Sequence, residues 1–223
     1  EMTVADTSEA FTLAGDDFTA SFDKKSGKIT SLQYGDREMI HDQTGLQFNW
    51  FRNISNDKYT DQRYYDTEPD APLFTFQVDN GNRSATVLVH STATIKNDRE
   101  IRVPVLIKYR IYSNGMIDVD ASFTLTDSRE IVRRLGFQMI LPREYTNIRY
   151  YGRGPHENYA DRKASTLIGL YETTPLEMES EHYVRSQSQG NREDIRWISL
   201  TDDQNKGIKI ISKDRLNFSA LHF

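Results

Sequence analysis

The chain has 223 residues, 37% hydrophobic and 11% aromatic, which is enough to bury the core of one large domain or two small ones. Its 28 basic and 33 acidic residues give a formal net charge of -5, and because nucleic acids bind basic faces, this balance argues against a nucleic-acid partner. The chain has no cysteine, which excludes disulfides and thiol chemistry, and no apolar run long enough to span a bilayer, so we expect no membrane partner.

Apolar and polar residues alternate with a period of two along most of the chain, which is typical of strands with one buried face. Turn residues separate pairs of such runs, and this arrangement predicts β-hairpins. In one pair, Val105 to Ile111 and Ile117 to Leu125 each place every second residue on an apolar face. The predicted hairpins cover 18–32 around Lys25-Ser26-Gly27, 74–95 around Asp79-Asn80-Gly81-Asn82, 105–125 around Ser113-Asn114-Gly115, and 197–212 around Asp202-Asp203-Gln204-Asn205.

Helical signals are weak by comparison, since no segment combines sustained helical spacing with caps. Many short strands with frequent turns indicate an all-β fold, a large antiparallel β-sandwich. The two tryptophans, Trp50 and Trp197, sit beside alternating apolar positions, so we expect them to pack in the core rather than to stack on a sugar.

A polar segment from Tyr150 to Arg162 reads YYGRGPHENYADR. Because Gly152, Gly154 and Pro155 set unusual backbone angles, we expect them to end any strand and to present the polar side chains that follow from a shaped loop. The alternative is that these polar groups satisfy the backbone of the loop itself. The side chains concerned are His156, Glu157, Asn158, Asp161 and Arg162.

Possible metal ligands are few. The carboxylates of Asp57, Asp61 and Asp66 lie in a tyrosine-rich segment and would suit calcium or sugar hydroxyls, but their spacing is not that of a known calcium loop, and a solvated loop is the alternative. The five histidines show no paired ligand spacing. We therefore assign no metal site.

A second dense segment, YVRSQSQGNREDIRW from Tyr183 to Trp197, completes a pattern. Together the two segments resemble the C-terminal, small-chain domain of bacterial β-galactosidases of glycoside hydrolase family 2. The family run G-x-G-P-x-E-N-Y-x-D-R is intact from Gly152 to Arg162. Its later run Y-x-x-P-Q-E-N-G-N-R, followed by R-W, is kept except at three positions, and the family segment F-x-R-A-P-x-D-N-D is similar to FNWFRNISND, which retains Arg52, Asn56 and Asp57. The three departures are Ser186, Ser188 and Gln189.

The resemblance implies a single supersandwich domain over residues 1–223, like that of galactose mutarotases, shortened at its C-terminus and cut from a larger β-galactosidase. In the family, the two catalytic glutamates of a retaining mechanism lie in a preceding β/α barrel. We therefore expect no catalytic residue here and no activity of the isolated chain. The domain is expected to cover the active-site face of the barrel, its partner, and to help form the galactoside pocket. The implied substrate-binding residues are Arg52, Asn56, Asp57, His156, Glu157, Asn158 and Arg162.

The resemblance implies no cofactor in this chain, because the Mg²⁺ and Na⁺ often used by the parent family are bound elsewhere. It leaves the compartment open between the cytoplasm and periplasm of a bacterium. Two other functions stay possible: a free-standing mutarotase-like epimerase, in which His156 and Glu157 would exchange protons with the sugar, and a carbohydrate-binding module.

Overall fold

The computed structural model describes residues 1–49, 72–79, 81–95, 101–125, 134–180, 183–184 and 187–222. Its chain contacts divide into two compact units, which meet in the sequence between Leu141 and Pro142. We refer to the part up to Leu141 as unit 1 and to the part from Pro142 as unit 2. Because a large sandwich domain can itself consist of two compact halves, the single domain over residues 1–223 stays a prediction.

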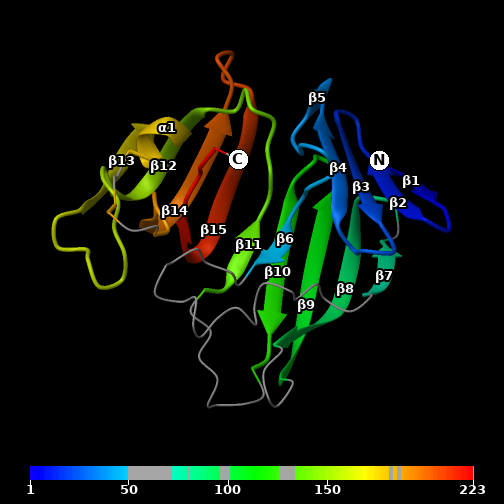
Figure 1. The fold of residues 1–223 in the computed structure, drawn as a ribbon. Coiled ribbons are helices and arrows are strands. Elements are labelled where there is room, and N and C mark those ends of the chain that lie inside the picture. The colour runs from blue at the N-terminus through cyan, green and yellow to red at the C-terminus, as the bar shows by residue number, and fades with distance from the viewer. Residues whose placement is uncertain are drawn as a thin grey trace. The chain divides into compact units, whose positions relative to one another are not determined.

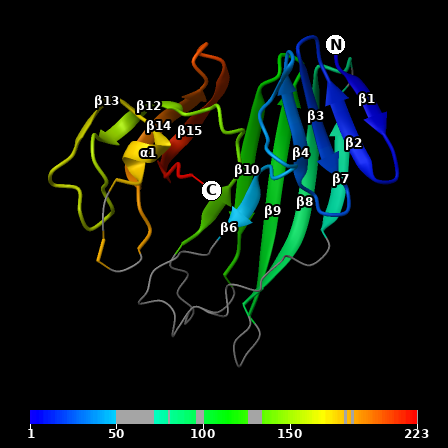
Figure 2. The same ribbon diagram turned by 45° about the horizontal axis from the view of Figure 1, so that its top comes forward.

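Unit 1 is a β-sandwich built from two antiparallel sheets. In Figures 1 and 2 the blue meander of the first sheet lies over the green and cyan strands of the second. A short third pair, β6 (Gln47–Asn49) with β11 (Gly136–Gln138), completes the described strands of this unit. The first sheet consists of β1 (Thr3–Asp6), β2 (Ala10–Ala14), β3 (Phe18–Asp23), β4 (Ile29–Tyr34) and β5 (Arg37–Glu38), in that order. The second has the order β10-β9-β8-β7, with β7 (Leu73–Val78), β8 (Ser84–Ile95), β9 (Ile101–Tyr112) and β10 (Ile117–Phe123).

Aromatic side chains join the two sheets of unit 1. The ring of Phe11 stacks on that of Phe76 with centroids 4.0 Å apart, and Phe22 meets Tyr109 edge to face at 5.3 Å. In β2 and β3 every second residue is buried, as the period-two pattern predicts. The prediction of an all-β sandwich is therefore confirmed.

All four predicted hairpins are present. At the turn between β9 and β10, Gly115 has a φ of 82°, in the left-handed region that a residue without a Cβ adopts at little cost. The predicted buried face of β10 is only partly buried, because Val119 and Phe123 are 39% and 41% exposed. Since β10 ends the order of the described strands in its sheet, it pairs on one side only, with β9.

Unit 2 is built on one four-stranded antiparallel sheet of order β13-β12-β14-β15. One face of the sheet carries a core in which Tyr150, Ile195 and Met178 are almost fully buried. The structure adds one short helix that the sequence did not indicate, where Thr174 and Glu177 form a capping box and Pro175 is the first helical residue. The elements are β12 (Asn147–Gly154), β13 (Leu167–Thr173), α1 (Pro175–Met178), β14 (Arg192–Thr201) and β15 (Gly207–Phe218).

The other face of this sheet carries a row of apolar residues, one from each strand. Leu170, Tyr151, Trp197 and Ile211 lie directly opposite one another across the four strands, and such partners point to the same face. Leu170 and Ile211 are 55% and 70% exposed. The prediction that Trp197 packs in the core is therefore wrong: its ring is only partly buried, and Lys209 Nζ lies 4.4 Å from the ring centroid.

Gly152 does not end the strand, as the sequence led us to expect, but lies within β12, whose last residue is Gly154. Their role is close packing. A Cβ on Gly152 would lie 3.0 Å from the Cα of Ile195, and one on Gly154 would lie 2.7 Å from the Tyr171 ring. Glycine is therefore needed here because neighbouring groups occupy the space of a side chain.

Among the described residues, the structure contains no helix of the length and apolar character that a membrane span requires.

Candidate functional site

The polar loop between β12 and β13 begins directly after Gly154. The Gly154–Pro155 peptide bond is cis, and the chain then turns back on itself between Tyr159 and Arg162. These two residues form an isolated antiparallel bridge, in which the Arg162 N–H donates to the Tyr159 carbonyl at 2.8 Å. A backbone hydrogen bond between Tyr159 and Arg162 thus holds the two ends of this turn together.

Glu157 lies at the centre of the loop, and its side chain is only 3% exposed. Its Oε1 accepts hydrogen bonds from the Arg162 guanidinium and the Tyr183 hydroxyl, while Oε2 accepts from the Gly190 N–H at 2.7 Å. Both carboxylate oxygens are therefore occupied by groups of the protein itself. These contacts join the two motifs that the sequence separates, because Tyr183 and Gly190 belong to the second.

The partners of Glu157 are held in defined charge states. Burial, followed by the hydrogen bond to Glu157, raises the pKa of the Tyr183 phenol, and the hydrogen bond to Tyr183 raises the pKa of Arg162. Arg162 Nη2 also donates to the Tyr183 oxygen at 3.1 Å. At neutral pH the group therefore contains a neutral phenol and a guanidinium cation, both directed at one buried carboxylate. The Arg162 side chain remains 52% exposed.

Asn158 is fully buried and links the loop to β14. Its Oδ1 accepts from the Glu193 N–H at 3.0 Å, and its Nδ2 donates to the His156 carbonyl at 3.0 Å. Its backbone exchanges two further bonds with Asn191. An amide side chain offers both a donor and an acceptor, and here both are used inside the protein.

A second buried cation lies below the loop. Arg192 is 4% exposed and donates from Nε to the Tyr150 hydroxyl and from Nη1 to the Gly190 carbonyl, both at 3.2 Å. Burial raises the pKa of Tyr150, so the phenol stays protonated as a neutral acceptor. Arg192 therefore ties the core of unit 2 to the segment that holds Glu157.

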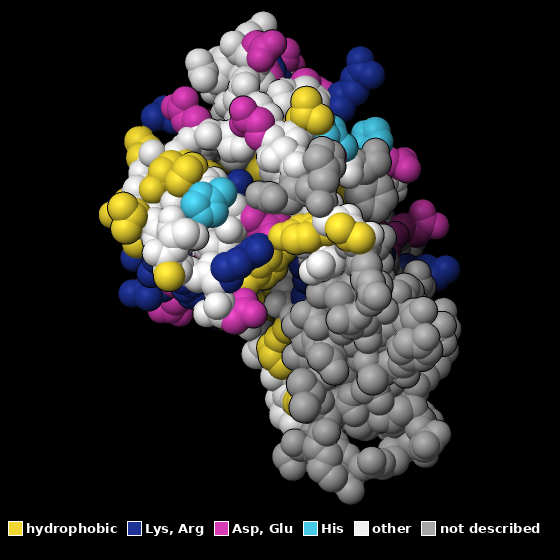
Figure 3. Space-filling model, turned by 60° about the vertical axis from the view of Figure 1, so that its left-hand side comes forward, with side chains coloured by type: hydrophobic (Ala, Val, Ile, Leu, Met, Phe, Trp, Pro, Cys, Tyr) yellow, Lys and Arg dark blue, Asp and Glu magenta, His cyan; other side chains and the backbone are white. Residues whose placement is uncertain are grey.

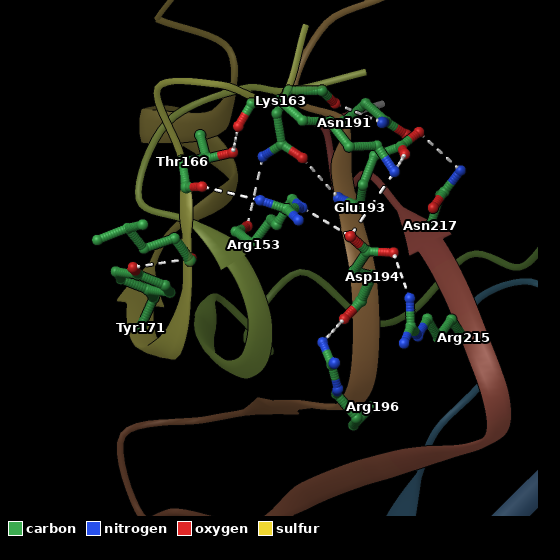
Figure 4. Close-up of polar contacts among 12 residues, drawn as sticks. Arg153, Lys163, Thr166, Tyr171, Asn191, Glu193, Asp194, Arg196, Arg215 and Asn217 are labelled. Carbon is green, nitrogen blue, oxygen red and sulfur yellow. Dashed lines mark hydrogen bonds and ion pairs between the residues drawn. The ribbon is translucent and has the colours of Figure 1, made fainter. Parts of the chain in front are cut away.

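The bulge at Glu193–Asp194 gathers charges from three parts of unit 2 (Figure 4). The register of β14 against β15 shifts here, and Asp194 adopts a φ of 56°, a left-handed conformation that aspartate tolerates better than most residues. Arg153 Nε lies 2.6 Å from Asp194 Oδ2, and Lys163 Nζ lies 2.5 Å from Glu193 Oε2. The hydrogen bond from Arg153 lowers the pKa of Asp194, which is therefore ionised at neutral pH.

His156 is exposed and does not share the partners of Glu157. Its Nε2 lies 2.9 Å from the Ser165 hydroxyl, whereas Glu157 binds Arg162, Tyr183 and Gly190. The two adjacent residues thus have separate partners.

The structure brings together four of the seven predicted substrate-binding residues, His156, Glu157, Asn158 and Arg162. It differs from the expectation that the loop presents all of them, because Glu157 and Asn158 are buried. Their substrate-binding roles stay predictions. The other three, Arg52, Asn56 and Asp57, lie outside the described residues, as do Trp50, Asp61 and Asp66.

Sequence analysis missed the cations and acids that fix the loop, namely Arg153, Lys163, Glu193 and Asp194. A signal was present, because the acidic pair at 193–194 is flanked by Arg192 and Arg196. That pattern shows neither which distant cation each acid binds nor that β14 bulges there. Over the described part of the chain, no three His, Asp or Glu side chains converge as metal ligands would.

Comparison with known proteins gives consistent results. The β-galactosidase small chain family matches residues 14–223. A β-galactosidase of Priestia megaterium is 25% identical over 230 aligned residues, which cover 100% of this chain and 21% of that enzyme. One from Lactobacillus delbrueckii subsp. bulgaricus is 28% identical, over 95% of this chain and 21% of the enzyme. One from Halalkalibacterium halodurans is 27% identical, over 89% and 20%. The chain thus spans about a fifth of the length of these relatives.

Proposed function

The chain belongs to the β-galactosidase small chain family, and from that premise we propose that it serves as a non-catalytic domain of an enzyme that hydrolyses terminal β-D-galactosides. In this proposal the domain covers the active-site face of a preceding β/α barrel in the same polypeptide. It also contributes one wall of the galactoside pocket. The observation that carries the proposal is the family match over residues 14–223, together with relatives about five times as long.

Three carboxylates, one in the loop and two in the bulge of β14, support a non-catalytic role. A retaining glycosidase needs one carboxylate as nucleophile and a second as acid and base, both facing the scissile bond. Glu157 is bound to Arg162, Glu193 to Lys163, and Asp194 to Arg153. Each is thus engaged by a cation of the protein, which suits a structural carboxylate better than one that attacks a sugar.

His156 and Arg162 are the residues of the loop best placed to contact a sugar. Both are exposed and both carry N–H donors, which pair with the hydroxyl oxygens of a galactoside. Glu157 and Asn158 support them from below, since Glu157 holds the Arg162 guanidinium and Asn158 holds the His156 carbonyl. We therefore assign sugar contact to the exposed pair and support of the loop to the buried pair.

Exposed apolar side chains on unit 2 support docking on the rest of the enzyme. Figure 3 looks towards the side of unit 2 that carries β13 and α1, and hydrophobic side chains appear there between charged ones. Leu167 and Leu176 are 74% and 69% exposed, and the row that includes Leu170 and Ile211 lies on the same sheet. Apolar surface of this kind is typical of a protein interface. The aromatic rings of the row suit sugar stacking less, because Lys209 lies over Trp197 and Arg196 over Tyr151.

The two other functions have less support. An epimerase would need His156 and Glu157 to act on one sugar ring, yet His156 pairs with Ser165, and Glu157 is buried among other partners. A free-standing carbohydrate-binding module would need a site that encloses much of its ligand. The loop presents His156, Asp161 and Arg162 as exposed side chains, while Glu157 and Asn158 are buried.

Three assays on the purified chain separate these functions. We expect no hydrolysis of a nitrophenyl β-galactoside, no acceleration of galactose mutarotation, and galactose binding in the millimolar range or weaker, about -4 kcal/mol or less favourable. Hydrolysis that survives repurification would overturn the non-catalytic role. Faster mutarotation would establish the epimerase, and micromolar binding abolished by Arg162→Ala would establish the binding module.

A chimera tests the domain role directly. The chain replaces the matching segment of the Priestia megaterium β-galactosidase, and hydrolysis is compared with that of the enzyme lacking this segment. We expect the chimera to be the more active, and Arg162→Ala within it to raise KM more than it lowers kcat. A chimera that folds but is no more active than the shortened enzyme would contradict the proposal.

A further inference from the structure

The Glu193–Asp194 bulge is more elaborate than a bend in β14 requires. Its two carboxylates are 7% and 14% exposed and bind cations from three other places in unit 2, Arg153 on β12, Lys163 in the loop and Arg215 on β15. Fixing a buried carboxylate is costly unless it is paired. The three cations therefore fix the segments that carry them to the bulge of β14.

Two of these cations hold the same short turn from opposite ends. Lys163 begins the turn and binds both carboxylates, at 2.5 Å from Glu193 and 3.6 Å from Asp194. Arg153 binds Asp194 through Nε and the carbonyl of Thr166, the end of the turn, through Nη1 at 2.9 Å. Thr166 closes the turn by donating from its N–H and its hydroxyl to the Lys163 carbonyl.

Ser165 lies inside this clamped turn, and its hydroxyl is the partner of His156 Nε2 at 2.9 Å. Because the ends of the turn are fixed to the bulge, the position of the Ser165 hydroxyl is fixed as well. A hydroxyl at a fixed position favours one orientation of the exposed imidazole that binds it. A connected set of contacts thus runs from Asp194 through Lys163 and Arg153 to the ring of His156.

We infer that Asp194 and Lys163 are positioning residues, which set the orientation of the His156 imidazole through the turn at 163–166 and the hydroxyl of Ser165. The left-handed conformation of Asp194 places its carboxylate where both cations reach it. The meaning of this arrangement for sugar binding rests on the proposed function. The arrangement itself can be tested without any sugar.

The test uses the whole chain with nitrogen-15 in its histidines, and the His156 ring signals are assigned by their loss in His156→Gln. Ser165→Ala removes the partner of His156 directly and gives the reference displacement of both ring nitrogens. We expect Asp194→Asn and Lys163→Gln to move the His156 signals in the same direction as Ser165→Ala. The matched control is Glu172→Gln, which removes a carboxylate from the exposed Arg149–Glu172 pair on the same sheet and should leave His156 unchanged.

Two folded variants whose His156 signals coincide with those of the native chain would overturn the inference, even if both melt at lower temperature. If Asp194→Asn does not fold, Lys163→Gln alone decides, since it leaves the backbone of the bulge untouched. The result is independent of the proposed function. If the His156 signals move but the assays contradict the sugar-binding role, the positioning inference stands and the proposed function is wrong. If the His156 signals do not move, the positioning inference is wrong whatever the galactose assays show.

Discussion

Units 1 and 2 each have an apolar core, but among the described residues only unit 2 also buries charged side chains. In unit 1, Phe11, Phe22 and Tyr109 fill the space between two sheets and touch mainly other rings and aliphatic groups. In unit 2, Glu157 and Arg192 are buried almost as deeply, but each is surrounded by hydrogen-bond partners. Apolar burial contributes in proportion to the area buried, whereas a buried charge depends on every partner it has. The loop should therefore be the more sensitive region to a single lost polar group.

Removal of Glu157 is the strongest test of this comparison. Glu157→Ala leaves the Tyr183 hydroxyl and the Gly190 N–H without their acceptor and Arg162 without its counter-ion. We expect a loss of about 3 kcal/mol in the free energy of unfolding, mainly because the Gly190 N–H and the Tyr183 hydroxyl lose their acceptor. Urea unfolding followed by circular dichroism measures it.

Glu172→Ala serves as the control for this experiment. The Arg149–Glu172 pair has similar chemistry, but its side chains are 54% and 70% exposed. We expect this control to lose at most about 1 kcal/mol, because water replaces the missing partner. Equal losses for the two variants would show that the polar groups of the loop are no more sensitive than surface ones.

The sequence predicted strands in both units, but it did not predict the contacts of the loop. The alternation at Val105, Ile107 and Tyr109 and the turn at Gly115 depend on neighbours within a few residues, and the hairpin they predict is present. The partners of Glu157 lie at Tyr183 and Gly190, and no local pattern states that these distant residues meet. Family resemblance joined the two motifs, yet it did not show that Glu157 is buried.

The glycines of β12 show the same limit in another form. From sequence, Gly152 reads as a break in the strand, because glycine relaxes the backbone. In the structure, glycine is needed because Ile195 of the neighbouring strand occupies the space that a side chain at position 152 would take. The residue is the same in both interpretations, and only the identity of the neighbour separates them.

Gly152→Ala tests this interpretation at the base of the loop. The added Cβ would lie 3.0 Å from the Cα of Ile195 and closer still to its Cδ1, and backbone atoms cannot move aside cheaply. We expect a loss of about 2 kcal/mol in the free energy of unfolding, as in other overpacked cores. Gly136→Ala in β11 is the control, because no atom of the described residues, apart from its chain neighbours, lies within 4 Å of its added Cβ. A fully stable Gly152→Ala would show that the sheet can open here without cost.

Tyr109→Phe gives the smallest effect and tests the comparison from the side of unit 1. The Tyr109 side chain is 0% exposed, and its hydroxyl has no hydrogen-bond partner among the described residues. Burial raises its pKa, so the phenol stays neutral, and what the core uses is its ring, which meets Phe22 at 5.3 Å. Removing the unpaired hydroxyl should leave the free energy of unfolding unchanged or raise it by up to about 1 kcal/mol. Tyr34→Phe is the matched control: that hydroxyl donates to the Gly115 carbonyl at 2.7 Å, so its removal should cost about 1 kcal/mol. If Tyr109→Phe is instead the more damaging of the two in thermal and urea unfolding, a polar contact must lie within the sandwich, and unit 1 would depend on buried pairing as unit 2 does.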